Sequence, residues 1–405
     1  MELHVPHYYD KFVCIADKCI DNCCFGGWEI NIDEDTVHYY QSLNSPFGKE
    51  IIDNLDYTDE YCFKLKDGHC PFLDKHNLCM IYKNLGESHL GVVCAQFPRY
   101  TEYYGDIKET GIGLACEEAA QIIFKDTSPF LLKTTIIEEP ADTSSEYDKE
   151  WGTFLFNIRN FFFDLLNKNQ YNLNDKLIIM IHIASEIQEY INHNDTSHLK
   201  ALYETLIHDA NIFEKYINKN HMSNDAKKIT NSESYSNTIK TKNYIINVED
   251  FMYKIWTIYL ELESINKEWD ITKNDVIQLL HSDNKKNYID ILNQYHTYIL
   301  NHTAIKYDNL IKYYIYRYFM KAAYDYNVLG KIQLAISNYL IVRELDMTQF
   351  IKNNFSFSFQ DQMDTIHIFS REIEYSEDNI EQLYEEFVFD NIFKAENLTK
   401  LLRIL

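Results

Sequence analysis

Nine cysteines lie within the first 116 residues of this 405-residue chain, and no residue after them is a cysteine. Four fall within eleven residues, as Cys14-x4-Cys19-x3-Cys23-Cys24, and a fifth is Cys62. Thiolates crowded in this way are the ligands that zinc, iron and iron–sulfur clusters prefer. The pattern predicts a metal–thiolate head whose ligands are Cys14, Cys19, Cys23, Cys24, Cys70, Cys79, Cys94 and Cys116.

Local spacing adds detail to this head. Asp74-Lys75-His76-Asn77 predicts a turn that returns Cys70 and Cys79 to one point. Cys62 lies in an alternating run and is interpreted as a small buried hydrophobe. Three histidines are interpreted as surface residues, because eight cysteines already suffice as ligands: His69, His76 and His89. Asp33 or Asp35 is expected to cap a helix over Thr36–Leu43.

Glycine and proline mark the boundary of the part that positions these thiols. All six prolines precede residue 141, and from Thr153 onward there is a single glycine, Gly330. Loop-rich and β-rich folds recruit both residues in their turns, whereas helix interiors exclude them. We therefore expect a mainly α chain with a loop-rich cysteine head over residues 1–125, a linker over 126–150 and an all-helical body over 151–405.

Apolar residues recur at spacings of three and four through the body, which predicts a series of helices. Residues 220–243 are polar and are expected to form a loop. The expected helices are Phe154–Asn167, Asp175–Ile191, Leu199–Ile217, Val248–Ile265, Lys273–Leu280, Tyr288–Ile299, Asn309–Tyr326, Lys331–Leu345, one beginning near Ser376–Asn379, and Glu396–Leu405.

Charge limits the partners. The net charge is −24, and acidic side chains outnumber basic ones in both parts, 19 to 9 over residues 1–116 and 43 to 29 after them. That balance argues against nucleic acid and against anionic membranes, which need basic surfaces, and it suits a partner that presents lysines. No export signal and no long apolar run is visible, so we expect a cytoplasmic chain with reduced thiols and no membrane insertion.

The cysteine motifs carry a resemblance. The opening described above, followed by Gly26-Gly27-Trp28, is similar to that of the flagellin lysine-N-methylase family, and so are Cys70-Pro71-Phe72-Leu73, Leu85-Gly86-Glu87 and Cys94-x-x-Phe97-Pro98-Arg99. The similarity covers the first 120 residues well and extends weakly over Ile158–Leu177. A broader set of cysteine-cluster proteins that chelate zinc or iron shares part of the pattern.

The resemblance implies methyl transfer from S-adenosylmethionine to a lysine amine of flagellin or a similar surface protein, with a 4Fe–4S cluster involved. The alternating strands and Gly-rich turn of the common methyltransferase fold are missing here, and Gly111-Ile-Gly113 lacks that setting. A cluster iron held by three cysteines keeps a position for the donor, whereas two closed four-sulfur sites, of zinc for example, would be structural.

The acceptor makes its own demand. A lysine amine has a pKa of about 10.4 and must lose a proton before it attacks a methyl group. Glu87 is the first candidate for the base, and Arg99 is a candidate for holding a carboxylate of the cofactor. The alternative function is a non-catalytic zinc- or iron-binding protein whose helical body binds a partner. A redox role of the cluster is a third possibility.

Overall fold

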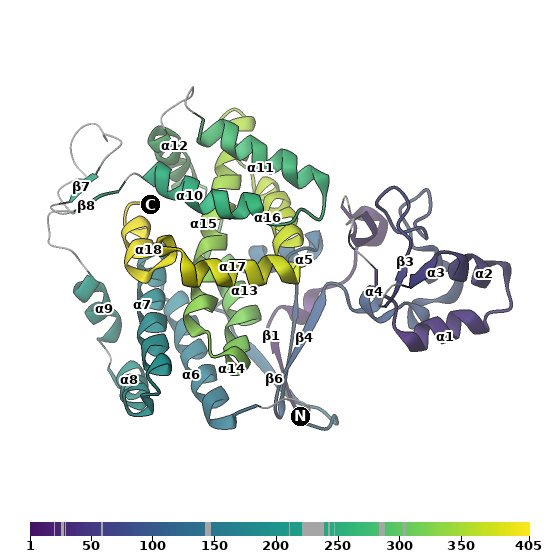
Figure 1. Ribbon diagram of the computed structural model, residues 1–405, viewed down its shortest axis with the longest axis horizontal. Coiled ribbons are helices and arrows are strands. Elements are labelled where there is room, and N and C mark those ends of the chain that lie inside the picture. The colour runs from purple at the N-terminus through teal and green to yellow at the C-terminus, as the bar shows by residue number, and fades with distance from the viewer. Residues whose placement is uncertain are drawn as a thin grey trace.

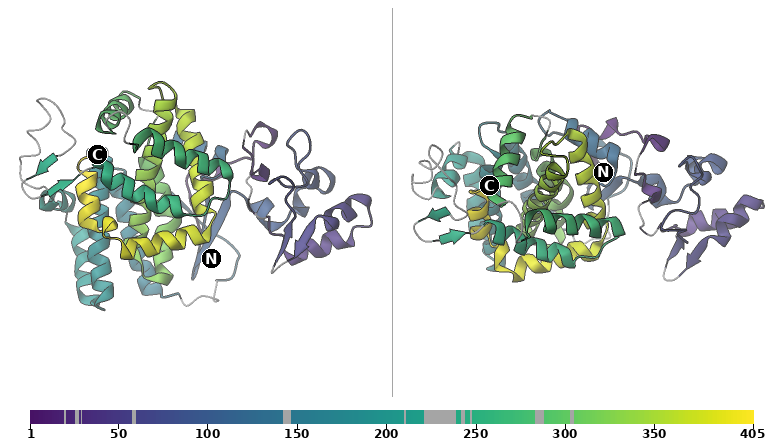
Figure 2. Two further views of the ribbon diagram at one scale, coloured as in Figure 1. Left: turned by 45° about the horizontal axis from the view of Figure 1, so that its top comes forward. Right: turned by 90° about the horizontal axis from the view of Figure 1, so that it is seen from above.

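The structure is a computed structural model of the whole chain. It describes every residue except 20, 26–27, 29, 58–59, 142–146, 210, 221–238, 242–243, 247, 283–287 and 303–304. Two parts are visible in Figure 1, a small lobe on the right and a large helical body on the left. Each has its own hydrophobic core, and the smaller core comprises buried residues from Ile30 to Ile81. Two further views show the same projecting lobe (Figure 2).

The small lobe is built from short elements joined by turns. Its helices and strands are α1 (Glu34–Ser42), α2 (Pro46–Asp53), β2 (Leu55–Tyr57), β3 (Tyr61–Phe63), α3 (Met80–Leu85) and α4 (Val92–Gln96), with 3-10 turns at η2 (Ala16–Lys18), η3 (Cys23–Phe25) and η4 (Glu87–His89). Asp33 caps α1, since its Oδ1 accepts from Thr36 N at 2.9 Å, and the expected cap is confirmed. The turn expected over residues 74–77 is also present, with Asn77 N donating to Asp74 O at 3.0 Å.

A four-stranded sheet joins the lobe to the body. Its order is β4–β5–β1–β6, with β1 (Glu2–Pro6) parallel to β5 (Ile107–Ile112) and antiparallel to β6 (Leu132–Ile136), and with β4 (Arg99–Tyr104) antiparallel to β5. The sheet and the following α5 (Glu117–Lys125) pack on the body core. The chain start and residues 99–136 thus belong structurally with the body. β6 was not expected within the predicted linker, because its mostly exposed residues carry no apolar alternation.

The body is helical, and the mainly α fold class is confirmed. Its helices are α6 (Lys149–Leu166), α7 (Leu173–Asn192), α8 (Thr196–His208), α9 (Ile212–Asn220), α10 (Val248–Glu261), α11 (Lys267–Leu280), α12 (Tyr288–Leu300), α13 (Asp308–Tyr318), α14 (Ala322–Asp325), α15 (Val328–Lys352), α16 (Phe359–Glu374), α17 (Glu377–Phe389) and α18 (Ala395–Leu402). Two short strands, β7 (Ile239–Thr241) and β8 (Tyr244–Ile246), pair with each other. β7 lies inside the segment 220–243, for which a loop was expected, and most of that segment lies outside the described residues.

α15 is the central element of the body. It packs against α7, α11, α13 and α16, and most of its residues are buried, polar ones included. Tyrosines from neighbouring helices satisfy several of those polar groups: Tyr259 Oη donates to Asn338 at 2.6 Å and Tyr288 Oη to Glu344 at 2.5 Å. Helix packing therefore accounts for much of the aromatic content of this chain.

Several expected helices differ in their bounds. α11 begins at Lys267, six residues before the expected start, and α15 ends at Lys352, seven residues after the expected end. The segment Leu199–Ile217 divides into α8 and α9, and Asp209 ends the first of them. The segment Asn309–Tyr326 divides at the 3-10 turn η6 (Phe319–Lys321) and ends at Tyr326, whose φ is 55°. α10 ends at Glu261, four residues before the expected end. Helix α16 lies in the body that was expected to be helical but is not among the helices named from the sequence, and it carries residues that contact the cysteine segment.

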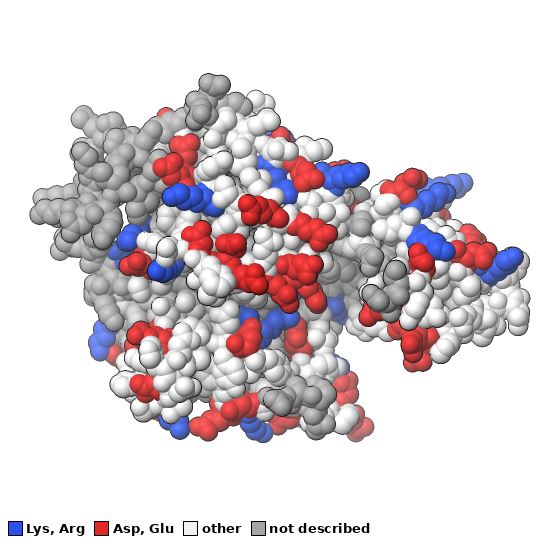
Figure 3. Space-filling view, in the orientation of Figure 1, with Lys and Arg blue, Asp and Glu red and all other residues white. Residues whose placement is uncertain are grey.

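Surface charge and hydropathy agree with the acidic composition. Carboxylates gather across the face shown in Figure 3, and α17 carries five of them, with no lysine or arginine: Glu377, Asp378, Glu381, Glu385 and Glu386. Burial and the nearby charges of Asp390 and Glu261 raise the pKa of Glu386 above its usual range. In the part of the chain that the structure describes, no helix is both long and apolar enough to cross a bilayer.

Candidate functional site

The nine cysteines all lie in the described part of the chain and form no disulfide. Seven of the eight predicted ligands fall into two sets, and the eighth, Cys23, interacts with both. Cys24, Cys70, Cys79 and Cys94 pack in or against the core of the small lobe, whereas Cys116 packs against the body core. Cys14 and Cys19 interact electrostatically with Cys116, and Cys23 interacts with Cys116 and with Cys70. Cys62 lies on β3, opposite Asp56, and bridges to Asn31.

The lobe set is organised by backbone contacts. Cys70 N donates to Cys24 O at 3.0 Å, and Cys79, which pairs with Leu73, is the N-cap of α3. Contacts of the Cys24 thiol with the sulfurs of Cys23 and Cys70 lower the pKa of both and raise that of Cys24. Burial, with the charges of Cys70, Cys23 and Cys79, raises the pKa of Cys94 to about 12. The thiols of this set are therefore close enough, and buried enough, for their charges to affect one another's pKa values.

The second set lies beside α5. Cys19 Sγ is 3.6 Å from Glu117 Oε2, and burial followed by the charge of Glu117 raises the pKa of Cys19. Cys116 is the N-cap of α5, and burial raises its pKa to about 11, with further contributions from the charges of Cys23 and Cys14. Like charges raise thiol pKa values, so a bound cation is what would favour the thiolate form in both sets.

The donor chemistry therefore fits a thiophilic metal or a cluster. Within the described residues, however, no group of three or more His, Cys, Asp or Glu side chains is close enough to hold a metal ion. The two glycines that precede Trp28 are outside those residues. Metal coordination by the eight cysteines accordingly stays a prediction, and so does the number of sites.

A body helix holds the cysteine segment. Asp21, between Cys19 and Cys23, accepts from Arg371 Nη1 at 2.6 Å, and its Oδ2 is 2.9 Å from His367 Nε2. Both partners lie on α16 and are buried, and Arg371 also contacts Glu372 through Nε at 3.2 Å. These contacts lower the pKa of Asp21 although burial opposes them. The thiol segment is thus anchored to the body as well as to its own lobe.

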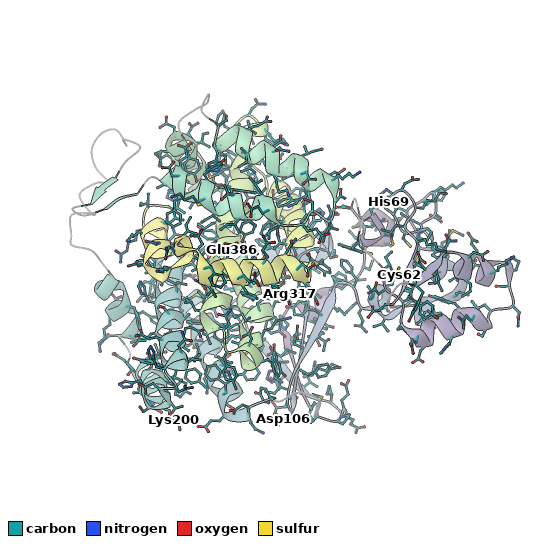
Figure 4. All side chains as sticks on the ribbon, in the orientation of Figure 1. Cys62, His69, Asp106, Lys200, Arg317 and Glu386 are labelled. Carbon is teal, nitrogen blue, oxygen red and sulfur yellow. The ribbon has the colours of Figure 1, made fainter. Side chains whose placement is uncertain are left out.

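A second junction surrounds Arg317, on the side of the body nearer the small lobe (Figure 4). The guanidinium is 3.1 Å from the buried Glu374 carboxylate. Four tyrosine rings lie within cation–π distance of it, from 4.7 Å for Tyr100 to 5.8 Å for Tyr313. Tyr313 and Tyr318 each donate to Glu374 at 2.8 Å. The charges of this pair therefore balance each other, with Glu374 fully buried and the Arg317 side chain mostly so.

Tyr375 extends this cluster toward the lobe. Its ring stacks on Trp28 at 5.3 Å, and Phe97 lies 5.8 Å from it, so rings from both parts form one half-buried aromatic surface. Burial raises the pKa of Tyr375 to about 12, while Arg317 opposes that shift. A Cβ on Gly113 would lie 2.9 Å from Tyr375 Oη, so this glycine permits close packing and has no nucleotide-binding setting.

The other two predicted site residues lie on the lobe side. Glu87 is exposed and begins the 3-10 turn η4. Arg99 begins β4, with its guanidinium 5.0 Å above the Phe12 ring, and it makes no ion pair with a described carboxylate. Among the histidines, His89 stacks on Tyr39 at 4.1 Å and His69 lies edge-on to Phe25 at 4.6 Å. The structure places the predicted thiol ligands at the lobe and at its junction with the body, without a metal-binding geometry among the described residues, and it leaves Glu87 exposed.

The residues that complete the junction come from α13 and α16 and were not identified from sequence. Arg317 sits inside the aromatic run Tyr313–Phe319, which the sequence alone does not distinguish from helix-packing surface. His367, Arg371 and Glu374 lie on α16, which is not among the helices named from the sequence. Only the three-dimensional arrangement shows that His367 and Arg371 contact Asp21 of the cysteine segment.

Fold and site define a class: a mainly helical protein with a thiol-rich lobe docked on its body. The model of the FliB lysine N-methylase C-terminal domain matches residues 159–401, and the chain belongs to this family. The resemblance seen in the cysteine motifs is thereby confirmed. The match falls on the helical body, where sequence motifs gave little signal.

Individual relatives agree. The chain is similar to the lysine-N-methylases of Salmonella typhimurium and Salmonella choleraesuis, each 26% identical over 213 residues, which is 50% of this chain and 52% of the relative. It is also 30% identical over 135 residues to the flagellar biosynthetic protein FliU of Salmonella muenchen, covering 31% of this chain and 79% of FliU. The chain thus spans about half the length of the lysine-N-methylases it matches. No solved structure matches.

Proposed function

We propose that this protein is a protein-lysine N-methyltransferase that uses S-adenosylmethionine and acts on flagellin or a similar surface protein. The observation that carries the proposal is the match of the helical body, residues 159–401, to the lysine N-methylase family. In the reaction the sulfonium S–CH3 bond breaks and an N–CH3 bond forms. The sulfur keeps the electron pair as a thioether, and the lysine nitrogen gives up one proton.

The thiol sets supply the proposed metal centre. We assign Cys14, Cys19, Cys23, Cys24, Cys70, Cys79, Cys94 and Cys116 as the candidate metal ligands. Three or four of them would hold a 4Fe–4S cluster, and zinc is the alternative metal. A cluster iron with an open position would chelate the amino and carboxylate groups of the donor. Arg99 has no carboxylate partner among the described residues, so its guanidinium is available to a cofactor carboxylate.

The acceptor site is proposed at the junction of lobe and body, where concave sites often form. Trp28, Phe97 and Tyr375 present aromatic faces there, and such faces attract an ammonium group. The lysine must also lose a proton, and Glu87 stays the proposed base. The net charge of −24 suits a lysine-bearing partner, and we place the reaction in the cytoplasm, before the substrate is exported.

One observation favours the alternative function, a protein whose metal is structural and whose helical body binds a partner. Cys24, Cys70, Cys79 and Cys94 pack with the core of the small lobe, which is the setting of a closed four-sulfur site. The two functions differ in what loss of metal does to the reaction and to the fold.

The test uses the full chain purified without oxygen, with iron, acid-labile sulfide and zinc counted per chain. Purified flagellin and S-adenosylmethionine labelled in its methyl group are then added. We expect the unmodified protein to contain iron and sulfide and to transfer label to lysine side chains of flagellin. In Cys19→Ser we expect the metal and the transfer of label to be lost, while circular dichroism still shows the helical signal. Zinc alone, with no label transferred to flagellin, would favour the structural alternative.

A further inference from the structure

A pocket of about 320 Å³ opens between α7, α8 and α9. These helices lie at the opposite end of the body from the small lobe (Figure 1), and Lys200 of α8 and Cys62 of the lobe mark the two ends in Figure 4. The pocket is therefore separate from the junction described above. None of the residues that line it has a role in the proposed methyl transfer.

Glu186 of α7 supplies the carboxylate of this pocket. Its two oxygens accept hydrogen bonds from Tyr190 Oη at 3.1 Å and from Tyr216 Oη at 3.0 Å. Both donors are neutral hydroxyls, and no described cation pairs with Glu186. A carboxylate can accept about four hydrogen bonds, so each oxygen keeps room for a further donor. The pocket thus contains a positioned anion that lacks a counterion.

The other charges of the pocket are already paired. Lys215 forms an ion pair with Asp209, and His198 Nδ1 is 2.5 Å from Asp195 Oδ2. Pairing leaves Glu186 as the unbalanced charge, so the pocket favours a cation over an anion. Apolar side chains complete it: Leu202 and Ile212 are buried, and the Tyr190 ring stacks on His198 at 5.4 Å. A cation on an aliphatic stem would suit both the Glu186 carboxylate and the apolar side chains of this pocket.

We propose that this pocket binds the side chain of a lysine, with its methylenes on Leu202 and Ile212 and its ammonium on Glu186 between the two tyrosine hydroxyls. The assignment of that lysine to the methyl-accepting protein rests on the proposed function. A long protein substrate would then be held at two places, at the junction, where one lysine reacts, and at this pocket, where another lysine is bound without reacting.

The experiment measures binding by the full chain, by calorimetry or ligand-observed NMR. The probes are Nα-acetyl-lysine N-methylamide, its norleucine analogue, which keeps the stem and lacks the ammonium, and butylamine. We expect the lysine probe to bind, the norleucine analogue to bind at least about tenfold more weakly, and salt to weaken the lysine probe, since charge-assisted hydrogen bonds are involved.

Variants localise the binding. Glu186→Gln keeps an acceptor for the tyrosines but removes the charge, and it should weaken the lysine probe about tenfold. Glu189→Gln, an exposed change of the same kind one turn along α7, is the matched control and should bind as the unmodified protein does. Ala201→Trp places a large side chain at the pocket wall on α8 while keeping Glu186, and it should also weaken binding. Unchanged thermal unfolding of each variant excludes misfolding.

Three results would overturn the proposal: no binding of the lysine probe, equal binding by Glu186→Gln and Glu189→Gln, or equal binding of the lysine and norleucine probes. Binding of butylamine without the lysine probe would assign the pocket to a free amine and overturn the protein contact. None of these measurements needs methyl transfer, so failure of the proposed function and failure of the pocket are told apart.

Discussion

Arg371 Nη1 lies 2.6 Å from Asp21 Oδ2 and joins α16 of the body to the cysteine segment of the small lobe. The two residues are 350 positions apart in the chain, and the guanidinium is only 4% exposed. A buried charge that loses its partner is strongly destabilising. The pair is therefore the contact through which the body fixes the segment between Cys19 and Cys23.

Arg371→Ala should cost about 3 kcal/mol in free energy of unfolding, because Asp21 and Glu372 lose a shared cation. Hydrogen exchange over residues 14–24 should become faster than in the unmodified protein. The stability and exchange rates of Arg371→Lys should lie between those of the unmodified protein and Arg371→Ala, since lysine keeps the charge but lacks the forked set of donors of arginine. Arg403→Ala removes an exposed arginine and serves as control. Unchanged exchange in the cysteine segment would show that Arg371 does not anchor it.

Gly113→Ala should destabilise the protein by about 1–3 kcal/mol, because the new methyl group would lie 2.9 Å from Tyr375 Oη and 3.1 Å from Arg317 Nη1. Tyr375→Phe removes the nearest of these atoms and a hydrogen bond from Arg317. We therefore expect the cost of Gly113→Ala to be smaller in the Tyr375→Phe background. Additive costs in a double-mutant cycle, measured by denaturant unfolding, would show that the two residues do not meet.

Much of this architecture was predictable from composition and spacing. Crowded cysteines predicted the lobe, and the loss of proline and glycine predicted the helical body. The order of the sheet was not predictable, because β1 pairs with strands about 100 residues later and such pairing leaves no local signal. α16 did carry a signal that was overlooked, since Ser358 and Asp361 form a capping box at its start.

The candidate site also contains some residues that were predictable from the sequence and others that were not. Thiols could be named because ligand residues are recognisable by type and spacing. Asp21, His367 and Arg371 could not, because a single aspartate and a helical arginine are ordinary until the fold places them together. Tyr375 and Trp28 likewise belong to segments that meet only through tertiary packing.

Asp346 predicts a pH dependence of stability. The carboxyl group is fully buried in α15, Tyr307 Oη donates to it at 2.6 Å, and burial raises its pKa to about 8. The folded state thus holds a proton that the unfolded state releases above about pH 4. The stability from this proton is complete below pH 4 and is lost as the pH rises through about 8.

The free energy of unfolding of Asp346→Asn, relative to that of the unmodified protein, should therefore rise by about 1.4 kcal/mol per pH unit between pH 4 and 8 and stay constant above that range. Denaturant unfolding of both proteins at a series of pH values measures this difference. A difference that is constant with pH, or that shrinks as the pH rises, would contradict a protonated Asp346 in the folded state.

If this protein methylates lysines of flagellin, as proposed, the added methyl groups must appear in the mass of flagellin. Flagellin is isolated from cells with and without the gene for this protein and is digested for mass spectrometry of its lysine peptides. We expect methylated lysines that disappear with the gene and return when the gene is restored. Identical lysine masses in both preparations, with flagellin present in each, would contradict the proposal.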